Sequence, residues 1–213
     1  MAQARNGSRP FSLRLALSST TLFRLYRSAH LPRGRKNVDS EPAGCIEFCT
    51  FEDSELSRTL ANYGKSGIRL TVDAFDCSCN DLIDLLIEQI GASPVPWDLF
   101  GSVPCHPWSS WQEMNCHTLG ESFRQKLEAD RRHSKKILLN FYRVADAVKE
   151  KGGRIAFEWP RRASGWKLPI MHGMIRDLGL YIADCDGCAF GMTNAKGEDV
   201  AHCHNLRPPG KGP

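Results

Sequence analysis

The sequence predicts an α/β protein with a mostly parallel β-sheet. Its 213 residues are 41% hydrophobic and 24% charged, which is ordinary usage for a globular domain. From residue 44 onward, short apolar runs alternate with segments of helical periodicity. We therefore expect one folded domain over 44–205, preceded by a basic leader over 1–43 and followed by a tail rich in Pro and Gly over 206–213.

Five segments are predicted as strands because each is a short apolar run between helical patterns. They cover 44–51, 68–75, 98–103, 154–159 and 180–183. Four helices are predicted between or beside them. Asp53 or Ser54 can cap the first helix, which ends at Gly64. The others are predicted over 80–91, 119–151 and 166–178, the last with Pro169 in its first turn.

Strands and helices that alternate at this spacing form parallel βαβ units. The predicted architecture is thus a doubly wound, Rossmann-like sheet with helices on both faces, and the segment 190–205 is predicted as a hairpin. In such sheets ligands bind beyond the carboxyl ends of the strands. The strand ends of this chain offer one candidate nucleophile, Cys105, and one well-placed carboxylate, Glu158.

The charge is unevenly distributed along the chain. Residues 1–43 hold seven Arg and one Lys against two acidic residues, a net charge of +6, whereas the other 170 residues hold 20 basic and 22 acidic residues, a net charge of −2. The body therefore lacks a global charge that favours nucleic acid. The leader has the composition of an organellar transit peptide, and a disordered basic arm fits it equally well. No run approaches the roughly 20 apolar residues of a membrane span, so no membrane partner is expected.

Nine cysteines, an odd count without a secretory signal, predict reduced thiols in an intracellular protein of the nucleus or cytoplasm, with the transit peptide left open. Cys185 and Cys188 have the spacing of half a zinc site, and Cys203 could join them. A zinc-stabilised interaction domain is therefore a third hypothesis. The alternative for this CxxC pair is two unligated thiols at a strand end.

Four segments, taken in order, carry a resemblance to a known family. They are Asp98-Leu-Phe-Gly-Ser-Val-Pro-Cys-His-Pro-Trp-Ser109, Ile155-Ala-Phe-Glu-Trp-Pro160, Leu178-Gly-Leu-Tyr-Ile182 and Cys188-Ala-Phe-Gly191. Over roughly 44–192 the chain resembles the catalytic domain of cytosine-5 DNA methyltransferases, most specifically around Cys105. It is also similar to shortened, methyltransferase-like reading frames of mobile elements.

The resemblance implies a DNA methylation type of chemistry with S-adenosylmethionine as cofactor. The Cys105 thiolate would add to carbon six of a cytosine ring, and Glu158 would bond the N–H edge of the ring and stabilise the adduct. From the residues alone, Cys105 could instead be a buried structural thiol and Glu158 an ion-pair partner of Arg161 or Arg162. The implied cofactor contacts are Phe48, Glu52, Asp53, Ser54, Asp73, Asp76 and Pro104.

The chain also departs from this family. Residues 49–53, Cys-Thr-Phe-Glu-Asp, stand where the family has a Gly-rich loop. The Gln-x-Arg-x-Arg segment and a target-recognition domain have no counterpart, so the implied partner is a nucleotide or single-stranded nucleic acid rather than duplex DNA. The alternative function is an inactive methyltransferase-like remnant that serves as a binding module or derives from a mobile element.

A basic cluster on the long predicted helix, with two tryptophans nearby in sequence, could contact phosphates and stack bases. It comprises Arg131, Arg132, His133, Lys135 and Lys136, and the tryptophans are Trp108 and Trp111. A solvated helix face is the alternative, because acidic residues precede the cluster at pairing distance.

Overall fold

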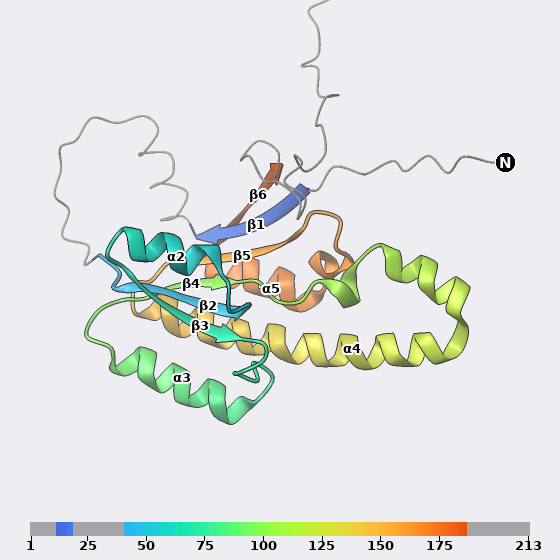
Figure 1. Cartoon of the computed structure of the whole chain (residues 1–213), viewed down its shortest axis with the longest axis horizontal. Coiled ribbons are helices and arrows are strands. Elements are labelled where there is room, and N and C mark those ends of the chain that lie inside the picture. The colour runs from blue at the N-terminus through green and yellow to red at the C-terminus, as the bar shows by residue number, and fades with distance from the viewer. Residues whose placement is uncertain (1–11, 19–40, 187–213) are drawn as a thin grey trace, which may run out of the picture.

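The computed structural model describes residues 12–18 and 41–186, which form a six-stranded mixed sheet with helices packed against it (Figure 1). The strands are β1 (Ser12–Ser18), β2 (Gly44–Thr50), β3 (Ser66–Thr71), β4 (Asp98–Gly101), β5 (Ile155–Pro160) and β6 (Leu180–Asp186). Their order is β3-β2-β4-β5-β1-β6. The first four pair in parallel, whereas β1 runs antiparallel to β5 and β6. The predicted α/β class with a mostly parallel sheet is confirmed.

The helices of the described residues connect these strands. They are α2 (Glu55–Asn62), α3 (Asn80–Ala92), α4 (Trp111–Glu150) and α5 (Pro169–Leu178), with the 3-10 helices η1 (His106–Trp108) and η2 (Ser164–Lys167). Ser54 caps α2, because its hydroxyl accepts a hydrogen bond from the backbone N–H of Leu56 at 3.2 Å. Gly179 ends α5 in the left-handed conformation, with φ of 65°.

The long helix begins at Trp111, earlier than the predicted start near 119. Gly120, with φ of 75° and ψ of −159°, lies at a kink between two helical segments. Trp111, Met114 and Leu119 of the first segment are exposed, so this segment lacks the apolar face that helical periodicity detects. The second segment has such a face, because Leu138, Phe141 and other residues of it are buried.

The predicted boundary of the folded domain at residue 44 is wrong in one respect. Ser12–Ser18, placed in the leader, forms β1 between β5 and β6, with Leu15 opposite Glu158 on one side and Ala183 on the other. Leucines at every second position of this segment have the period of a strand, and the surrounding arginines obscured it. Antiparallel pairing on both sides then satisfies its backbone hydrogen bonds.

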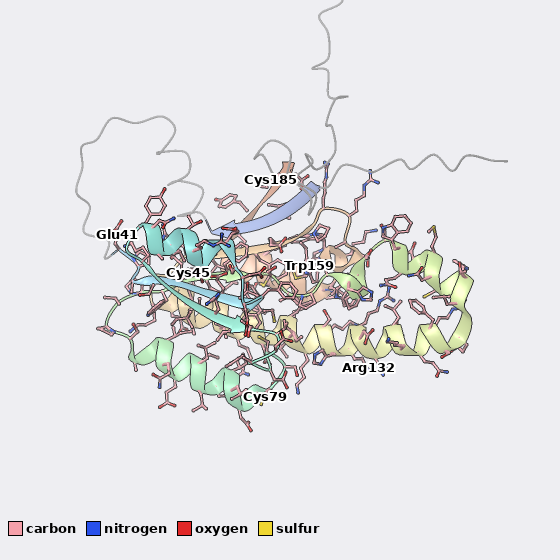
Figure 2. All side chains as sticks on the ribbon, in the orientation of Figure 1. Glu41, Cys45, Cys79, Arg132, Trp159 and Cys185 are labelled. Carbon is pink, nitrogen blue, oxygen red and sulfur yellow. The ribbon has the colours of Figure 1, made fainter. Side chains whose placement is uncertain are left out.

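Aromatic rings fill the core beneath the sheet. Phe141 of α4 packs between Phe48 of β2 and Phe157 of β5, at centroid distances of 5.4 and 5.2 Å. Trp159 continues the cluster, 5.2 Å from Phe157 and 5.9 Å from Trp166. Figure 2 labels Trp159 in the interior, between the sheet and the helices. These contacts fix α4 against the middle strands of the sheet.

The carboxyl ends of β2, β3, β4 and β5 lie at one edge of the sheet, because these strands are parallel. The loops 51–54, 72–79 and 102–105 and the turn after Pro160 therefore gather there. The predicted hairpin at 190–205 and the tail at 206–213 lie outside the described residues.

Candidate functional site

Cys105 and Glu158 come together at the carboxyl ends of two neighbouring parallel strands. Cys105 follows β4 and is half-buried, and Glu158 lies near the end of β5 and is half-buried as well. The two groups interact electrostatically: burial raises the pKa of the Cys105 thiol above 9.0, and the charge of Glu158 raises it further. The resting cysteine is thus a thiol, unlike the thiolate that the resemblance implies.

Glu158 is a carboxyl group that holds its proton more tightly than in water. Burial raises its pKa, and a hydrogen bond from the hydroxyl of Ser102, 2.7 Å from Oε1, opposes that rise. The predicted alternative, an ion pair with Arg161 or Arg162, is not formed in the described part of the chain, where Arg161 instead pairs with Asp184 at 3.0 Å. Glu158 can therefore act on a bound ring as either proton donor or acceptor.

The loop that carries Cys105 is held by its backbone carbonyls. Each carbonyl from Cys105 to Trp108 accepts a hydrogen bond from a different element or from the turn itself. The backbone N–H of Trp108 donates to the carbonyl of Cys105 at 2.9 Å, and Nε2 of Gln112 donates to that of His106 at 2.9 Å. Nε of Arg131 donates to the carbonyl of Pro107 at 3.2 Å, and Oγ of Ser164 donates to that of Trp108 at 3.1 Å. The side-chain donors come from α4 and η2. These hydrogen bonds hold the loop rigid in addition to the restraint that Pro104 and Pro107 impose on its backbone.

A cavity of about 270 Å³ opens beside this loop, beyond the ends of β2, β3 and β4. Its lining includes two residues predicted to contact a cofactor, Asp76 and Pro104, together with His106. It also includes two buried thiols: Cys49, from the segment that stands in place of the family's Gly-rich loop, and Cys77, which no prediction placed there. Ligand pockets usually enclose about 300–1,000 Å³, so the volume of this cavity is just below that range.

Cys49 and Cys77 are neighbouring buried thiols in the wall of this cavity. Interaction with Cys77 and burial both raise the pKa of the Cys49 thiol, whereas interaction with Cys49 lowers the pKa of Cys77 against the effect of burial. Asp76 next to it accepts a bond from the backbone N–H of Ser78 at 2.8 Å, and its bonds to Ser78 lower the pKa of its carboxyl group.

The backbone of Cys49 has a conformation typical of glycine. Its φ is 59°, the one positive value at a non-glycine residue in the described part of the chain. It stands where the resemblance implies a Gly-rich loop. The backbone there follows a path that glycine takes at low cost, but a thiol side chain now points into the wall of the cavity.

The other predicted cofactor contacts lie apart from this cavity. Phe48 is fully buried and packs on Phe141, so it is a core residue that a ligand cannot reach. Ser54 caps α2 and donates to the buried carboxylate of Glu47. The remaining three, Glu52, Asp53 and Asp73, are exposed in the turns after β2 and β3 and do not line the cavity.

The predicted zinc ligands are not brought together by the described residues. Cys188 and Cys203 lie outside that part of the chain, and Cys185 lies in β6. In residues 12–18 and 41–186, no three His, Cys, Asp or Glu side chains form a group that could hold a metal ion. The same residues contain no helix with the length and apolar character needed to span a bilayer.

The predicted basic cluster on α4 is divided by the fold. Trp108 is buried, with Arg131 and Lys135 over its ring at 5.5 and 5.9 Å, so it cannot stack on a base. Arg131 instead joins a second, larger pocket of about 530 Å³. Sequence reasoning missed this pocket, because its cations come from segments that are far apart in the chain. The adjacent pair Arg161-Arg162 directly after Pro160 was the available signal.

Comparison of the chain with protein-family models, with curated proteins and with solved structures finds no match. The function is therefore argued from the site itself.

Proposed function

We propose that this protein is an S-adenosylmethionine-dependent methyltransferase of the cytosine-5 type, with Cys105 as nucleophile. One observation carries the proposal: Cys105 and Glu158, far apart in sequence, lie within electrostatic reach of each other at the carboxyl ends of β4 and β5. A thiol and a carboxyl group in that arrangement can act on the same ring. The cavity lined by Pro104 and His106, the two chain neighbours of Cys105, supplies space for a cofactor.

The proposal includes a doubly wound, Rossmann-like architecture with helices on both faces. Neighbouring residues of β2 support it, because Glu47 accepts hydrogen bonds from Ser57 of α2, whereas Phe48 packs on Phe141 of α4. Successive side chains of a strand point to opposite faces. The chain reverses its direction of strand addition between β2 and β4, and ligands bind at such reversals.

The two residues have separate roles in the proposed reaction. The Cys105 thiol loses its proton to solvent and its Sγ forms a bond to carbon six of the ring, while the electron pair of the five–six double bond is displaced and makes carbon five nucleophilic. Glu158, with its raised pKa, supplies a proton to the ring edge as negative charge develops there. S-Adenosylmethionine, when bound, provides the methyl group that carbon five accepts. Transfer of the carbon-five proton to solvent re-forms the five–six double bond and expels the Cys105 thiolate from carbon six, and the ring edge returns its proton to Glu158.

Cofactor binding is where this chain departs most from the family it resembles. Cys49, Phe75 and Cys77 line the cavity and narrow it, while Asp76 offers a carboxylate to the ribose hydroxyls or amino group of the cofactor. We expect weaker binding than a Gly-rich loop would give, because the thiol of Cys49 occupies space that a glycine leaves open.

The second candidate is an inactive relative that serves as a binding module. The raised pKa of Cys105 and the small cavity favour it, because both reduce catalysis without removing the fold. It differs from the first candidate in a single property, the ability of Cys105 to form a covalent adduct.

Two measurements on the full chain test the proposal. Calorimetric titration with S-adenosylmethionine should show saturable binding. A single-stranded oligonucleotide that carries a 5-fluorocytosine should form a covalent adduct in the presence of the cofactor, and Cys105→Ser should abolish it. Cys79→Ser, also a half-buried thiol, is the matched control and should retain the adduct. Binding without an adduct would support the inactive module, and absence of binding would overturn both the enzyme and its cofactor.

A further inference from the structure

The larger pocket, of about 530 Å³, lies between the start of α4 and the connection from β5 to α5. We propose that this pocket binds the phosphate group of a nucleotide, either free or within a single-stranded nucleic acid. The inference goes beyond the proposed function, because phosphate binding needs neither S-adenosylmethionine nor a reactive Cys105.

Positive charge dominates the pocket wall. Among the described residues that line it, four carry a full positive charge and one, Glu113, is acidic. The four are Arg131, Arg161, Arg162 and Lys167. Convergent cations in a concave site attract phosphate, and arginine forks match its oxygens in geometry.

Two of the arginines are held in place and still have donors to offer. Arg131 uses Nε on the carbonyl of Pro107 at 3.2 Å and one terminal nitrogen on Glu128 at 2.9 Å. Arg161 uses Nε on Asp184 at 3.0 Å. In both, N–H groups of the terminal nitrogens remain for a ligand, and the fixed guanidinium loses less conformational freedom on binding.

The other two cations have no ion pair with a described residue. Arg162 and Lys167 are both exposed. Arg162 precedes η2, and Lys167 is the last residue of η2. Their charge is therefore not neutralised by the described part of the protein. Arg162 and Lys167 therefore attract a phosphate group more strongly than Arg131 and Arg161, whose charge is partly offset by their carboxylate partners.

The pocket also has an apolar wall, which favours a nucleotide over a bare inorganic anion. Ala163, Trp166, Ile175 and Ile182 line it beside the cations. Such a wall fits the flat, weakly polar body of a base or sugar. Trp111, which follows the lining residue Ser110, is 60% exposed and can stack on a neighbouring base.

The position of the pocket relates it to the candidate active site. Ser109 and Ser110 follow the Cys105 loop through η1, and Arg161 and Arg162 follow Glu158 within a few residues. Both segments leave the same edge of the sheet. A nucleotide whose phosphate occupies the pocket would therefore lie against the two segments that continue from Cys105 and from Glu158.

Fluorescence anisotropy with a labelled single-stranded oligonucleotide, on the full chain without cofactor, tests the inference. Arg162→Gln/Lys167→Gln should weaken binding about tenfold and reduce the salt dependence of log K by about 1.4, or about 0.7 for each lost phosphate contact. The control Arg132→Gln/Lys136→Gln removes the same charge from α4, where Arg132 points away from the sheet (Figure 2). The control should lose less than about threefold.

A gain of affinity provides a check that misfolding cannot imitate. Glu113→Gln removes the acidic side chain from the pocket wall and should tighten binding severalfold. Equal losses in the pocket and control variants, or no effect of Glu113→Gln, would overturn the inference.

Competition by an unlabelled nucleoside monophosphate identifies a small nucleotide as the ligand. Competition by oligonucleotide alone identifies a strand. Competition by inorganic phosphate at the same concentration as the monophosphate would contradict the role of the apolar wall. The assay needs neither cofactor nor covalent adduct, so failure of the methyltransferase proposal leaves this test intact.

Discussion

The hydroxyl of Ser102 lies 2.7 Å from Oε1 of Glu158, and this bond joins the ends of β4 and β5 beneath Cys105. It partly offsets the burial that raises the pKa of the Glu158 carboxyl. Ser102 also donates its backbone N–H to the carbonyl of Phe48 at 3.1 Å. The carboxyl group is thus tied to the middle of the parallel sheet.

Glu158→Gln should make the folded protein less sensitive to rising pH. The native state holds the proton of Glu158 more tightly than the unfolded chain, so the stability contributed by that proton is present below the unfolded pKa of 4.5 and lost as pH rises through the folded pKa. Glutamine keeps an acceptor for Ser102 but does not ionise. Urea unfolding should show the variant gaining stability relative to the native chain between pH 4 and pH 7.5. A pH-independent difference would contradict the assigned pKa shift.

Glu158→Gln should also increase the reactivity of Cys105. Loss of the neighbouring negative charge lowers the pKa of the thiol, which burial still keeps above its ordinary value. The rate of iodoacetamide alkylation at Cys105, followed by peptide mass spectrometry, should rise at a lower pH in the variant. The alkylation rate of Cys116, measured in the same digest, corrects for the pH dependence of the reagent itself. An unchanged pH profile would show that the two side chains do not interact.

At residue 49, glycine should be tolerated better than valine. A φ of 59° costs a β-branched residue about 1–3 kcal/mol, and glycine pays none of this. Urea unfolding of Cys49→Gly and Cys49→Val should differ by about that amount. If the cavity beside Cys77 holds the cofactor, Cys49→Gly should also bind S-adenosylmethionine more tightly than the native chain. Equal stabilities of the two variants would contradict the left-handed backbone.

Gly101→Ala should destabilise the core by about 1–3 kcal/mol through overpacking. A Cβ there would lie 2.8 Å from Cζ of Phe141 and 2.9 Å from Cδ2 of Phe157, and both rings are fully buried. Gly91→Ala in α3 is the matched control, since its Cβ meets no atom within 4 Å and alanine is the better helix former. The control should gain about 0.5–1 kcal/mol in urea unfolding.

Leu15→Pro should destabilise the sheet by about 3 kcal/mol or more, because proline removes a ladder hydrogen bond from a strand paired on both sides. Leu15→Val keeps the backbone donor and should cost far less. Urea unfolding measures both. A proline variant as stable as the native chain would show that Ser12–Ser18 does not pair as a strand of the sheet.

The parallel strands β2 to β5 follow from local patterns in the sequence, since a run such as Ile155–Pro160 is apolar apart from Glu158 over the length of one strand and the helical periods lie between such runs. The sequence also placed Cys105 and Glu158 at strand ends, because that follows from element order alone. These are local properties of the chain, set by a few neighbouring residues.

Only the tertiary structure decided which strand ends meet and what surrounds them. The insertion of β1 between β5 and β6 depends on a partner about 140 residues away, for which a seven-residue segment carries no signal. Burial and the charge of Glu158 oppose ionisation of Cys105, and both come from other segments. The cavity at Cys49 and Cys77 and the cationic pocket at Arg131 and Arg162 likewise exist only where separate loops converge. Shape and electrostatic environment are sums over the packed neighbours of a residue, and those neighbours come from segments far apart in the sequence, where local patterns do not reveal them.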